Sequence, residues 1–434
     1  MPDPEVDRQM RQDWDRRARE DACYYVAFGR RRQSAEEFFA TAADVLHAIR
    51  VELPRFPSGT DPAALSALEI GCGPGRLLVP LSRLFGSVVG VDVSQEMIDL
   101  ARANLAGIPN ARAELASGSD LAQFPADAFD LCYSYAVFQH IPSREVVFNY
   151  LREARRVLKI GGILKCQFNG LPEDARVAAD TWSGVRFRHT QLRAFCRDHD
   201  LQLLLLDGLD TQNLWMSARK RPAGSTASLR PVPGARLIRI SNTYTGDLVV
   251  PAAGRFSSAS LWVQGLAADA DCNNLQVEIA GRLAAPCYVG GRGPQGPNQV
   301  NVFLPPETPT GPVPVRLWML GQPISGFARL RVIPAPPPAP RILSVTDGIN
   351  LLSNLRTDTR SLKVQVEEVG RHPVFHASLG GRPLEDLDLS CVDPLSDRYA
   401  INLKVPPEIP PGPHRLILSL GGRPFAPVQV EVVA

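Results

Sequence analysis

The chain has 434 residues, a formal net charge of +2 and 44% hydrophobic residues, which allow several domains with sizeable cores. No global basic field favours nucleic acid as a partner. No apolar run is long enough to span a bilayer, and no apolar segment of the signal-peptide type follows Met1. We therefore expect a soluble, cytoplasmic protein. Eight cysteines without a C-x-x-C pair argue against a metal site and against a disulfide framework.

Residues 1–50 have the pattern of a helical segment. Asp7 to Arg19 is highly charged, with Trp14 and Ala18 at helical spacing. Aromatic residues gather in the stretch that follows, at Tyr24, Tyr25 and Phe28.

A glycine-rich loop follows the first predicted strand. The apolar run at 67–70 leads into Gly71, Gly73 and Gly75, where the lack of a Cβ permits a ligand to approach the backbone closely. A helix then opens at 77–79, and its N-terminus presents free N–H groups. A dinucleotide fingerprint is G-x-G-x-x-G, with the third glycine one position later, so the spacing disfavours a nicotinamide cofactor.

Acidic residues follow the next two predicted strands. Strand 88–92 ends in Asp92, about 20 residues after the loop, where a ribose-binding acid is expected. Ser94 is a candidate N-cap for a helix over 95–105. The polar loop at 116–121 contains a second acid, Asp120.

Strands and helices continue to alternate up to residue 220, which predicts a parallel sheet covered on both faces. The expected helices cover 143–159, which would stop at Gly161 and Gly162, and 190–199. The remaining expected strands cover 129–135, 163–168, 201–206 and 213–219.

These landmarks, in this order, resemble the class I S-adenosylmethionine (SAM) methyltransferases, in their small-molecule, type 11/12-like branch. The resemblance covers residues 60–220 and implies a Rossmann-like, seven-stranded α/β domain over 51–222 with SAM as cofactor and S-adenosylhomocysteine as product. It also implies that the N-terminal helical cap, 1–50, folds over the cofactor. The sequence lacks the motifs of the methyltransferases that modify base amines, cytosine carbon or arginine.

The resemblance implies specific roles around the cofactor. Asp92 should accept hydrogen bonds from the ribose hydroxyls, Asp120 should face the adenine amine, and Glu69 should orient the amino group of SAM or the glycine loop. The residues expected to contact the cofactor are Glu69, Gly71, Cys72, Gly73, Gly75, Arg76, Asp92, Val93, Met97, Ser119, Asp120, Leu121, Ser134 and Tyr135.

Methyl transfer is an in-line displacement, so a base is needed only if the acceptor must lose a proton. His140 follows the fourth strand and is a candidate base near neutral pH, but it is equally a residue that shapes this turn. Tyr25 is the second catalytic candidate, and Trp182 and Arg186 are candidates for the acceptor pocket. The acceptor is expected to be a small molecule or a glycan, methylated on O, N or C.

Beyond a linker at 222–228 the sequence becomes rich in proline and in β-type alternation. Residues 305–312 match 406–413, which indicates a duplication with a period of about 100 residues. We expect two all-β, immunoglobulin-like sandwich modules of the IPT/TIG type, over 230–335 and 340–434, joined by a stiff proline linker at 334–340.

The modules are expected to do no chemistry and to dock onto a protein partner, a glycan-bearing substrate or a second copy of the chain. Residues 1–222 alone are then expected to bind SAM. A different class of function stays open, in which the chain binds SAM without catalysis and the β-modules bind the partner or glycan.

Overall fold

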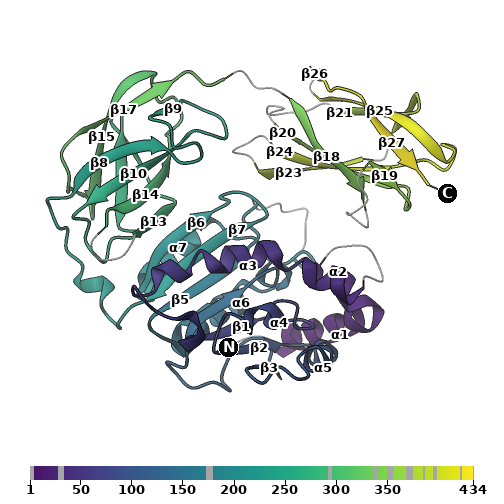
Figure 1. The fold of residues 1–434 in the computed structure, drawn as a ribbon, viewed down its shortest axis with the longest axis horizontal. Helices are drawn as coiled ribbons and strands as arrows, with labels where there is room; N and C mark the ends of the chain where they lie inside the picture. The colour runs from purple at the N-terminus through teal and green to yellow at the C-terminus, as the bar shows by residue number, and fades with distance from the viewer. Residues whose placement is uncertain are drawn as a thin grey trace. The chain divides into compact units, whose positions relative to one another are not determined.

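The structure is a computed structural model of the chain (Figure 1). It describes residues 4–27, 34–172, 179–291, 296–336, 340–348, 355–367, 375–384, 387–393, 398–420 and 423–433. The backbone forms two compact units, one of residues 1–22 and 39–335 and the other of residues 23–38 and 336–434.

The first unit contains the seven predicted strands of the α/β domain, in the order β3-β2-β1-β4-β5-β7-β6. The first five strands run parallel, and β7 is antiparallel to both of its neighbours. This arrangement confirms the predicted Rossmann-like sheet. The strands are β1 (Ser66–Ile70), β2 (Ser87–Asp92), β3 (Ala111–Leu115), β4 (Phe129–Ser134), β5 (Leu158–Phe168), β6 (Leu201–Asp207) and β7 (Leu214–Lys220).

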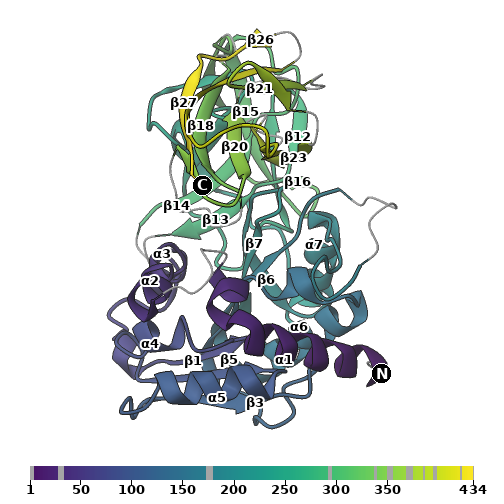
Figure 2. The same cartoon turned by 90° about the vertical axis from the view of Figure 1, so that its right-hand side faces the viewer.

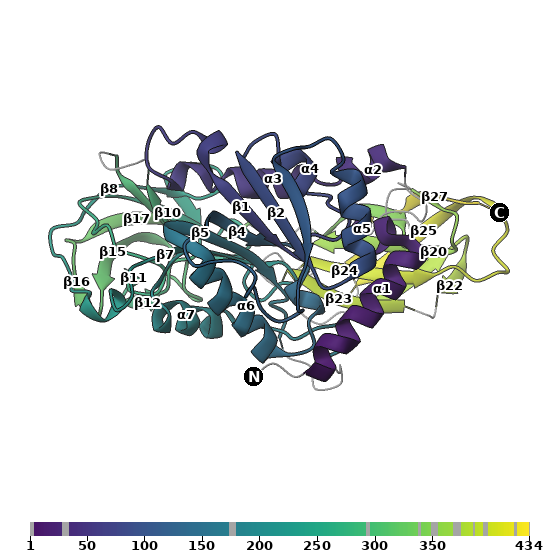
Figure 3. The same cartoon turned by 90° about the horizontal axis from the view of Figure 1, so that it is seen from below.

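Helices cover both faces of this sheet, and two separate apolar clusters lie beneath them (Figure 3). Ser94 caps one helix as predicted, because its hydroxyl accepts from the N–H of Met97. The helices are α1 (Pro4–Ala27), α2 (Ala35–Ala40), α3 (Ala43–Arg50), α4 (Leu78–Leu81), α5 (Gln95–Asn104), α6 (Arg144–Val157) and α7 (His189–Asp198), with short 3-10 turns at Leu53–Arg55, Pro62–Ala64, Phe138–His140 and Thr226–Ser228. No described helix is long and apolar enough to cross a membrane.

The predicted end of the helix at 143–159 is wrong by two residues, because β5 begins directly at Leu158. The two glycines, Gly161 and Gly162, lie inside this strand as a bulge. The pairing with β4 jumps from Leu158 to Ile163, and Gly161 has φ +86°. A Cβ on Gly162 would lie 2.9 Å from a neighbouring backbone oxygen. The glycines therefore permit the bulge rather than stop the helix.

The first all-β region has two sheets, and one of them extends the sheet of the α/β domain. β13 pairs with β6, so β13-β14-β10-β8 continue the order into one eleven-stranded sheet, and the second sheet is β12-β11-β15-β17-β9. The strands are β8 (Arg236–Asn242), β9 (Val249–Pro251), β10 (Ser258–Gln264), β11 (Leu275–Ile279), β12 (Arg282–Ala284), β13 (Tyr288–Gly291), β14 (Asn298–Phe303), β15 (Gly311–Met319), β16 (Gln322–Pro323) and β17 (Ala328–Ile333).

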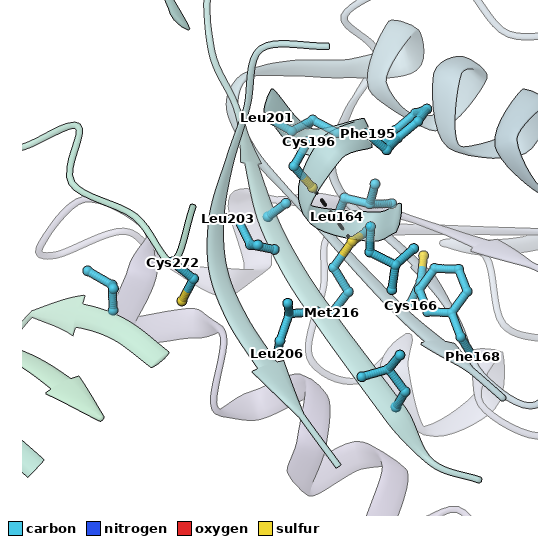
Figure 4. Packing of buried hydrophobic residues seen from close by; sticks show 14 of the residues in the cluster. Leu164, Cys166, Phe168, Phe195, Cys196, Leu201, Leu203, Leu206, Met216 and Cys272 are labelled. Atoms are coloured by element: carbon cyan, nitrogen blue, oxygen red, sulfur yellow. Dashed lines mark hydrogen bonds between the residues drawn. The ribbon is translucent and has the colours of Figure 1, made fainter. Parts of the chain in front are cut away.

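Backbone hydrogen bonds and apolar packing join this region to β6. The N–H of Leu206 donates to the carbonyl of Cys287 at 2.8 Å, and the N–H of Cys272 donates to that of Leu203 at 2.7 Å. Figure 4 shows Cys272 on the segment next to Leu203, and Met216 and Leu206 belong to the same apolar cluster. The first β-region is therefore not held apart from the α/β domain but shares its core.

The second unit repeats the strand order of this first β-region. Its sheets are β18-β20-β24-β23 and β19-β27-β25-β21-β22, which match strand for strand the elements ten places earlier. The strands are β18 (Arg341–Asp347), β19 (Arg356–Thr357), β20 (Ser361–Glu367), β21 (Phe375–Leu379), β22 (Arg382–Leu384), β23 (Leu387–Asp393), β24 (Arg398–Lys404), β25 (Gly412–Leu420), β26 (Arg423–Pro424) and β27 (Val428–Val432).

A register shift recurs in the matching strand pair, β8 with β10 and β18 with β20. The predicted all-β organisation after residue 230 is confirmed at this level. Pro337 and Pro338 of the expected linker, and Phe28 of the N-terminal segment, lie outside the described residues.

Candidate active site

The glycine loop is tied to the end of β2 through Asp92. One carboxylate oxygen accepts from the N–H of Gly73 at 2.9 Å, and the other accepts from the N–H of Ser94 at 2.9 Å. Burial raises the pKa of Asp92 to about 6. Asp92 therefore links two loops at the carboxyl edge of the sheet, where open α/β sheets bind their ligands.

The three glycines of the loop share a positive φ, but the space beside them differs. Gly71, Gly73 and Gly75 all have positive φ, at +76°, +51° and +84°. A Cβ on Gly71 would lie 2.3 Å from the side chain of Val137, so protein atoms already occupy that space. A Cβ on Gly75 would make only ordinary contacts with Ala101. The expectation of ligand space against every glycine is thus corrected at Gly71, where Val137 takes it.

Glu69 lies at the end of β1 and is 3% exposed. Its carboxyl accepts from the hydroxyl of Tyr133 at 2.9 Å. Burial raises the pKa of Glu69 to about 8, so the group is mostly protonated at neutral pH. A neutral carboxyl attracts an ammonium group weakly, so this arrangement favours the role of orienting the loop over that of binding the amino group of SAM.

The loop after β3 presents Ser119 and Asp120. The Ser117 hydroxyl accepts from both of their N–H groups, at 3.2 and 3.0 Å. Asp120 is half-buried and accepts from the N–H of Ala122 at 3.2 Å. The two predicted acids thus follow adjacent strands, β2 and β3, at the same edge of the sheet.

Four other predicted cofactor residues have almost fully buried side chains. Ser134 donates its hydroxyl to the carbonyl of Ile70 at 3.0 Å and so joins β4 to β1. Val93 is half-buried and lies against Gly118. The buried residues are Cys72, Met97, Leu121 and Ser134. The structure gives these side chains packing roles, and their contact with the cofactor stays a prediction.

The chain turns sharply where β4 ends. Ala136 has φ +56°, a conformation that non-glycine residues adopt rarely and often at functional sites. Its N–H donates to the side chain of Gln167 at 3.0 Å. Next to it, the ring of Tyr135 stacks on Trp215 of β7 at 5.5 Å and 8°. Sequence reasoning missed Gln167 and Trp215, because nothing local in β5 or β7 marks the residue that reaches this edge.

His140 has both ring nitrogens engaged. Nδ1 lies 2.6 Å from the carbonyl of Trp182 and Nε2 lies 3.2 Å from the amide nitrogen of Gln139. Burial lowers the pKa of His140 to about 4. A neutral imidazole that donates through Nδ1 and accepts through Nε2 has no free position for a substrate proton. This geometry favours the turn-shaping role over catalysis.

Helix α1 contacts the loops after β2 and β3, and Figure 2 shows it running beside α5 and β3. Asp15 accepts from the hydroxyl of Ser94 at 2.6 Å and from the N–H of Glu96 at 3.3 Å. Asp7 accepts from the hydroxyl of Ser119 at 2.9 Å. Sequence analysis did not single out these acids, although their spacing of eight places both on one helix face.

The same helix also reaches the loop that contains Trp182. The Arg17 guanidinium lies 4.8 Å from the ring centre of Trp14 and 5.2 Å from that of Trp182. It also donates to the carbonyl and the hydroxyl of Thr181, at 2.9 and 3.0 Å. Trp14 in turn meets His140 edge to face at 5.5 Å. Residues 4–22 therefore contact every loop predicted to surround the cofactor, except the glycine loop.

Tyr25 belongs to the second compact unit, where its ring meets Tyr24 at 5.2 Å. Its catalytic role stays a prediction. Over the described residues, no cluster of three or more His, Cys, Asp or Glu could hold a metal ion.

Part of the α/β domain is similar to known methyltransferases. Residues 68–166 match a family model described as a methyltransferase domain. The chain is 33% identical over 103 residues to a trans-aconitate 2-methyltransferase of Rhizobium rhizogenes, covering 23% of this chain and 37% of the relative. It is 30% identical over 121 residues to a ubiquinone biosynthesis O-methyltransferase of Xanthomonas axonopodis pv. citri, covering 27% and 49%. The chain thus spans less than half the length of these curated relatives.

Among solved structures, a phosphoethanolamine N-methyltransferase 1 of Haemonchus contortus matches with a TM-score of 0.40 and 16% identity, covering 52% of this chain and 51% of that one. Residues 68–166 are thus similar to a methyltransferase domain, and the sheet order agrees with this similarity. SAM is the cofactor that this similarity implies.

The residues present fit that cofactor. Asp92 supplies carboxylate oxygens beside a loop whose glycines adopt positive φ, and Asp120 keeps one carboxylate oxygen without a hydrogen bond from the described residues. A ribose offers hydroxyl donors and an adenine offers an amine donor, which these acceptors suit.

Proposed function

We propose that the chain is a SAM-dependent methyltransferase that acts on a small molecule or glycan-type acceptor. The observation that carries the proposal is the position of Asp92, which holds the glycine loop and the start of α5 at the carboxyl edge of the sheet. SAM, when bound, supplies an electrophilic methyl group.

The residues of the chain would bind and orient the two substrates. Asp92 would accept hydrogen bonds from the ribose hydroxyls, Asp120 would accept one from the adenine amine, and the glycine loop would bind the methionine part. Residues 4–22 of α1, which contact the loops after β2 and β3, would exclude water from the cofactor. Because both nitrogens of His140 are engaged, transfer would depend on positioning more than on proton removal.

Calorimetric titration of the full chain with SAM, S-adenosylhomocysteine and NAD tests this proposal. We expect both sulfur compounds to bind one site per chain and NAD to give no binding heat. Binding of NAD without binding of SAM would instead support a nicotinamide-dependent oxidoreductase.

We further propose that the β-modules are immunoglobulin-like docking modules through which the chain meets a second copy of itself, a protein partner or a glycan-bearing substrate. Large apolar side chains that stand out from the first module support this role, namely Leu248 at 65% and Phe327 at 62% exposure. Sedimentation of the full chain and of the L248S/F327S variant tests self-association. A concentration-dependent dimer that the variant weakens is expected, and a monomer at all concentrations would exclude the self-association.

A further inference from the structure

Arg76, directly after the glycine loop, is a buried cation with few partners. It is 6% exposed. One terminal nitrogen donates to the carbonyl and the hydroxyl of Thr41 at 3.3 and 3.2 Å, at or beyond the long end of the hydrogen-bond range. Its Nε is buried without a hydrogen-bond partner. A guanidinium has five N–H donors, so this one is poorly satisfied.

No carboxylate of the described residues forms an ion pair with Arg76. Burial lowers the pKa of Arg76, while the nearby Tyr135 and, after it, Glu69 raise this pKa. Glu69 itself is hydrogen-bonded to Tyr133 and is mostly protonated at neutral pH, because burial raises its pKa to about 8. Buried charges in proteins are normally paired. The counter-charge of Arg76 is thus missing from the described chain.

One aromatic ring lies next to this cation, and a second ring stacks on the first. The centre of the Tyr135 ring lies 5.5 Å from the guanidinium carbon, and Tyr135 stacks on Trp215. Both rings are half-buried. Tyr135 directly follows β4, and Trp215 lies at the start of β7, opposite Gln167 of β5, at the carboxyl edge of the sheet. A buried guanidinium beside two stacked planar rings suits a flat ligand that carries a carboxylate.

We propose that Arg76 binds a ligand carboxylate at this edge, and that the carboxylate belongs to the methyl acceptor, whose planar part packs against Tyr135 and Trp215. This inference rests on the proposed function and deepens it by naming the class of acceptor. The other source of the same chemistry is the methionine carboxylate of SAM, which the experiment separates from the acceptor.

The first measurement is the thermal unfolding of ligand-free wild type, R76M and R76K. If Arg76 serves a ligand, replacing an unpaired buried charge by Met leaves the unfolding midpoint unchanged or raises it. If Arg76 instead had a structural role, R76M would lower the unfolding midpoint and R76K would lower it by a smaller amount. A clear loss of stability in both variants would overturn the proposal.

The second measurement uses benzoate as the planar carboxylate and benzamide as its neutral isostere. We expect benzoate, but not benzamide, to stabilise the wild type both alone and in saturating S-adenosylhomocysteine. In R76M the affinity for benzoate should fall roughly ten- to a hundredfold, as for the loss of a charge-assisted hydrogen bond. R76K should retain part of it, because a lysine keeps the charge without the planar fork. A wild type that does not distinguish benzoate from benzamide would overturn the proposal.

The third measurement separates the two carboxylate sources. 5′-Methylthioadenosine lacks the amino-acid part of S-adenosylhomocysteine. If R76M weakens binding of S-adenosylhomocysteine but not of methylthioadenosine, and S-adenosylhomocysteine abolishes the benzoate effect, the carboxylate is that of the cofactor and the acceptor assignment is wrong. Failure of both nucleosides to bind the wild type would refute the proposed methyltransferase function instead, while the response to benzoate alone still reports on Arg76.

Discussion

At the scale of single residues, the burial of Glu69 makes stability depend on pH. Its pKa of about 8 in the fold lies above the ordinary value of 4.5 for a glutamate. Between these two pH values the folded chain keeps a proton that the unfolded chain loses. The contribution of Glu69 to the free energy of unfolding is therefore fully present below pH 4.5 and is lost as the pH rises through 8. Each pKa unit corresponds to roughly 1.4 kcal/mol.

We therefore expect the urea midpoint of the wild type to decrease as the pH rises from about 5 to 8. The E69Q variant should show a flatter profile over this range. Glutamine keeps an acceptor for Tyr133 and cannot ionise. Urea denaturation across this pH range measures the difference. Parallel profiles for the two proteins would mean that Glu69 ionises in the fold as it does in water.

The residues that could be predicted from sequence are those whose role is local. Gly73 and Asp92 follow strands directly, and the structure places them in hydrogen-bonding contact. Gln167 and Trp215 could not be predicted, because their role depends on which strands become neighbours. The packing role of Gly71 was missed for the same reason, since Val137 lies 66 residues further along the chain.

At the scale of elements, a buried ion pair joins the segment after α3 to the sheet. Lys165 of β5 lies 2.6 Å from Glu52, which also accepts from the hydroxyl of Ser217 on β7. Both charged side chains are nearly inaccessible, at 3% and 1% exposure. Although burial opposes ionisation, Arg55 and Lys165 lower the pKa of Glu52.

Removing Lys165 would leave the buried Glu52 carboxylate with Arg55 as its remaining ion-pair partner. We expect K165M to lower the free energy of unfolding by about 1.5–3 kcal/mol, as for the loss of a hydrogen bond to a charged group. The exposed pair of Arg112 and Glu114 provides the control, since R112M should cost under about 1 kcal/mol. Chemical denaturation of the two variants checks this. Equal effects would show that Lys165 contributes no more than a surface charge.

Helix α1 is the element that we expect to retain the cofactor. Asp15 holds it to the start of α5 through Ser94 and Glu96. D15A should speed dissociation of S-adenosylhomocysteine roughly tenfold, as for one charge-assisted hydrogen bond, in stopped-flow displacement. R8A is the matched control, because Arg8 is an exposed residue of the same helix that pairs with Glu5. If D15A and R8A dissociate at the same rate, α1 does not close the site.

The sequence predicted most element boundaries of the α/β domain, and its periodicity gave the helix at 95–105 to within one residue. The junction of α6 and β5 was missed because paired glycines usually end helices, whereas here they permit a bulge. The order of β6 and β7 was not predicted, since periodicity does not determine which strands pair.

At the scale of the whole molecule, the first β-region completes the α/β domain. The sequence placed a boundary near residue 222, where composition changes. The structure continues one compact unit to residue 335, because β13 pairs with β6 and the two regions share an apolar cluster. Composition shows where proline and glycine increase, but it does not show which sheet edges meet.

A fragment of residues 1–222 would expose the edge of β6 and apolar side chains beneath it. We expect its melting temperature to lie roughly 10 °C below that of a fragment of residues 1–335. Losing the shared core should cost several kcal/mol of unfolding free energy, and each kcal/mol lowers the melting temperature by about 2–4 °C. Both fragments lack residues 336–434, so their difference isolates the first β-region. Coincident melting curves in calorimetry would show that the shared core adds nothing and that the boundary near 222 is correct.

The central claim is that Asp92 holds the cofactor of a methyltransferase, and titration of the full chain with S-adenosylhomocysteine tests it most directly. D92N removes the charge at the end of β2, whereas D99N removes an exposed charge from α5 of the same unit. D92N should weaken binding by roughly ten- to a hundredfold, as for charged hydrogen bonds, and D99N should bind like the wild type. Wild-type affinity in D92N would contradict the account.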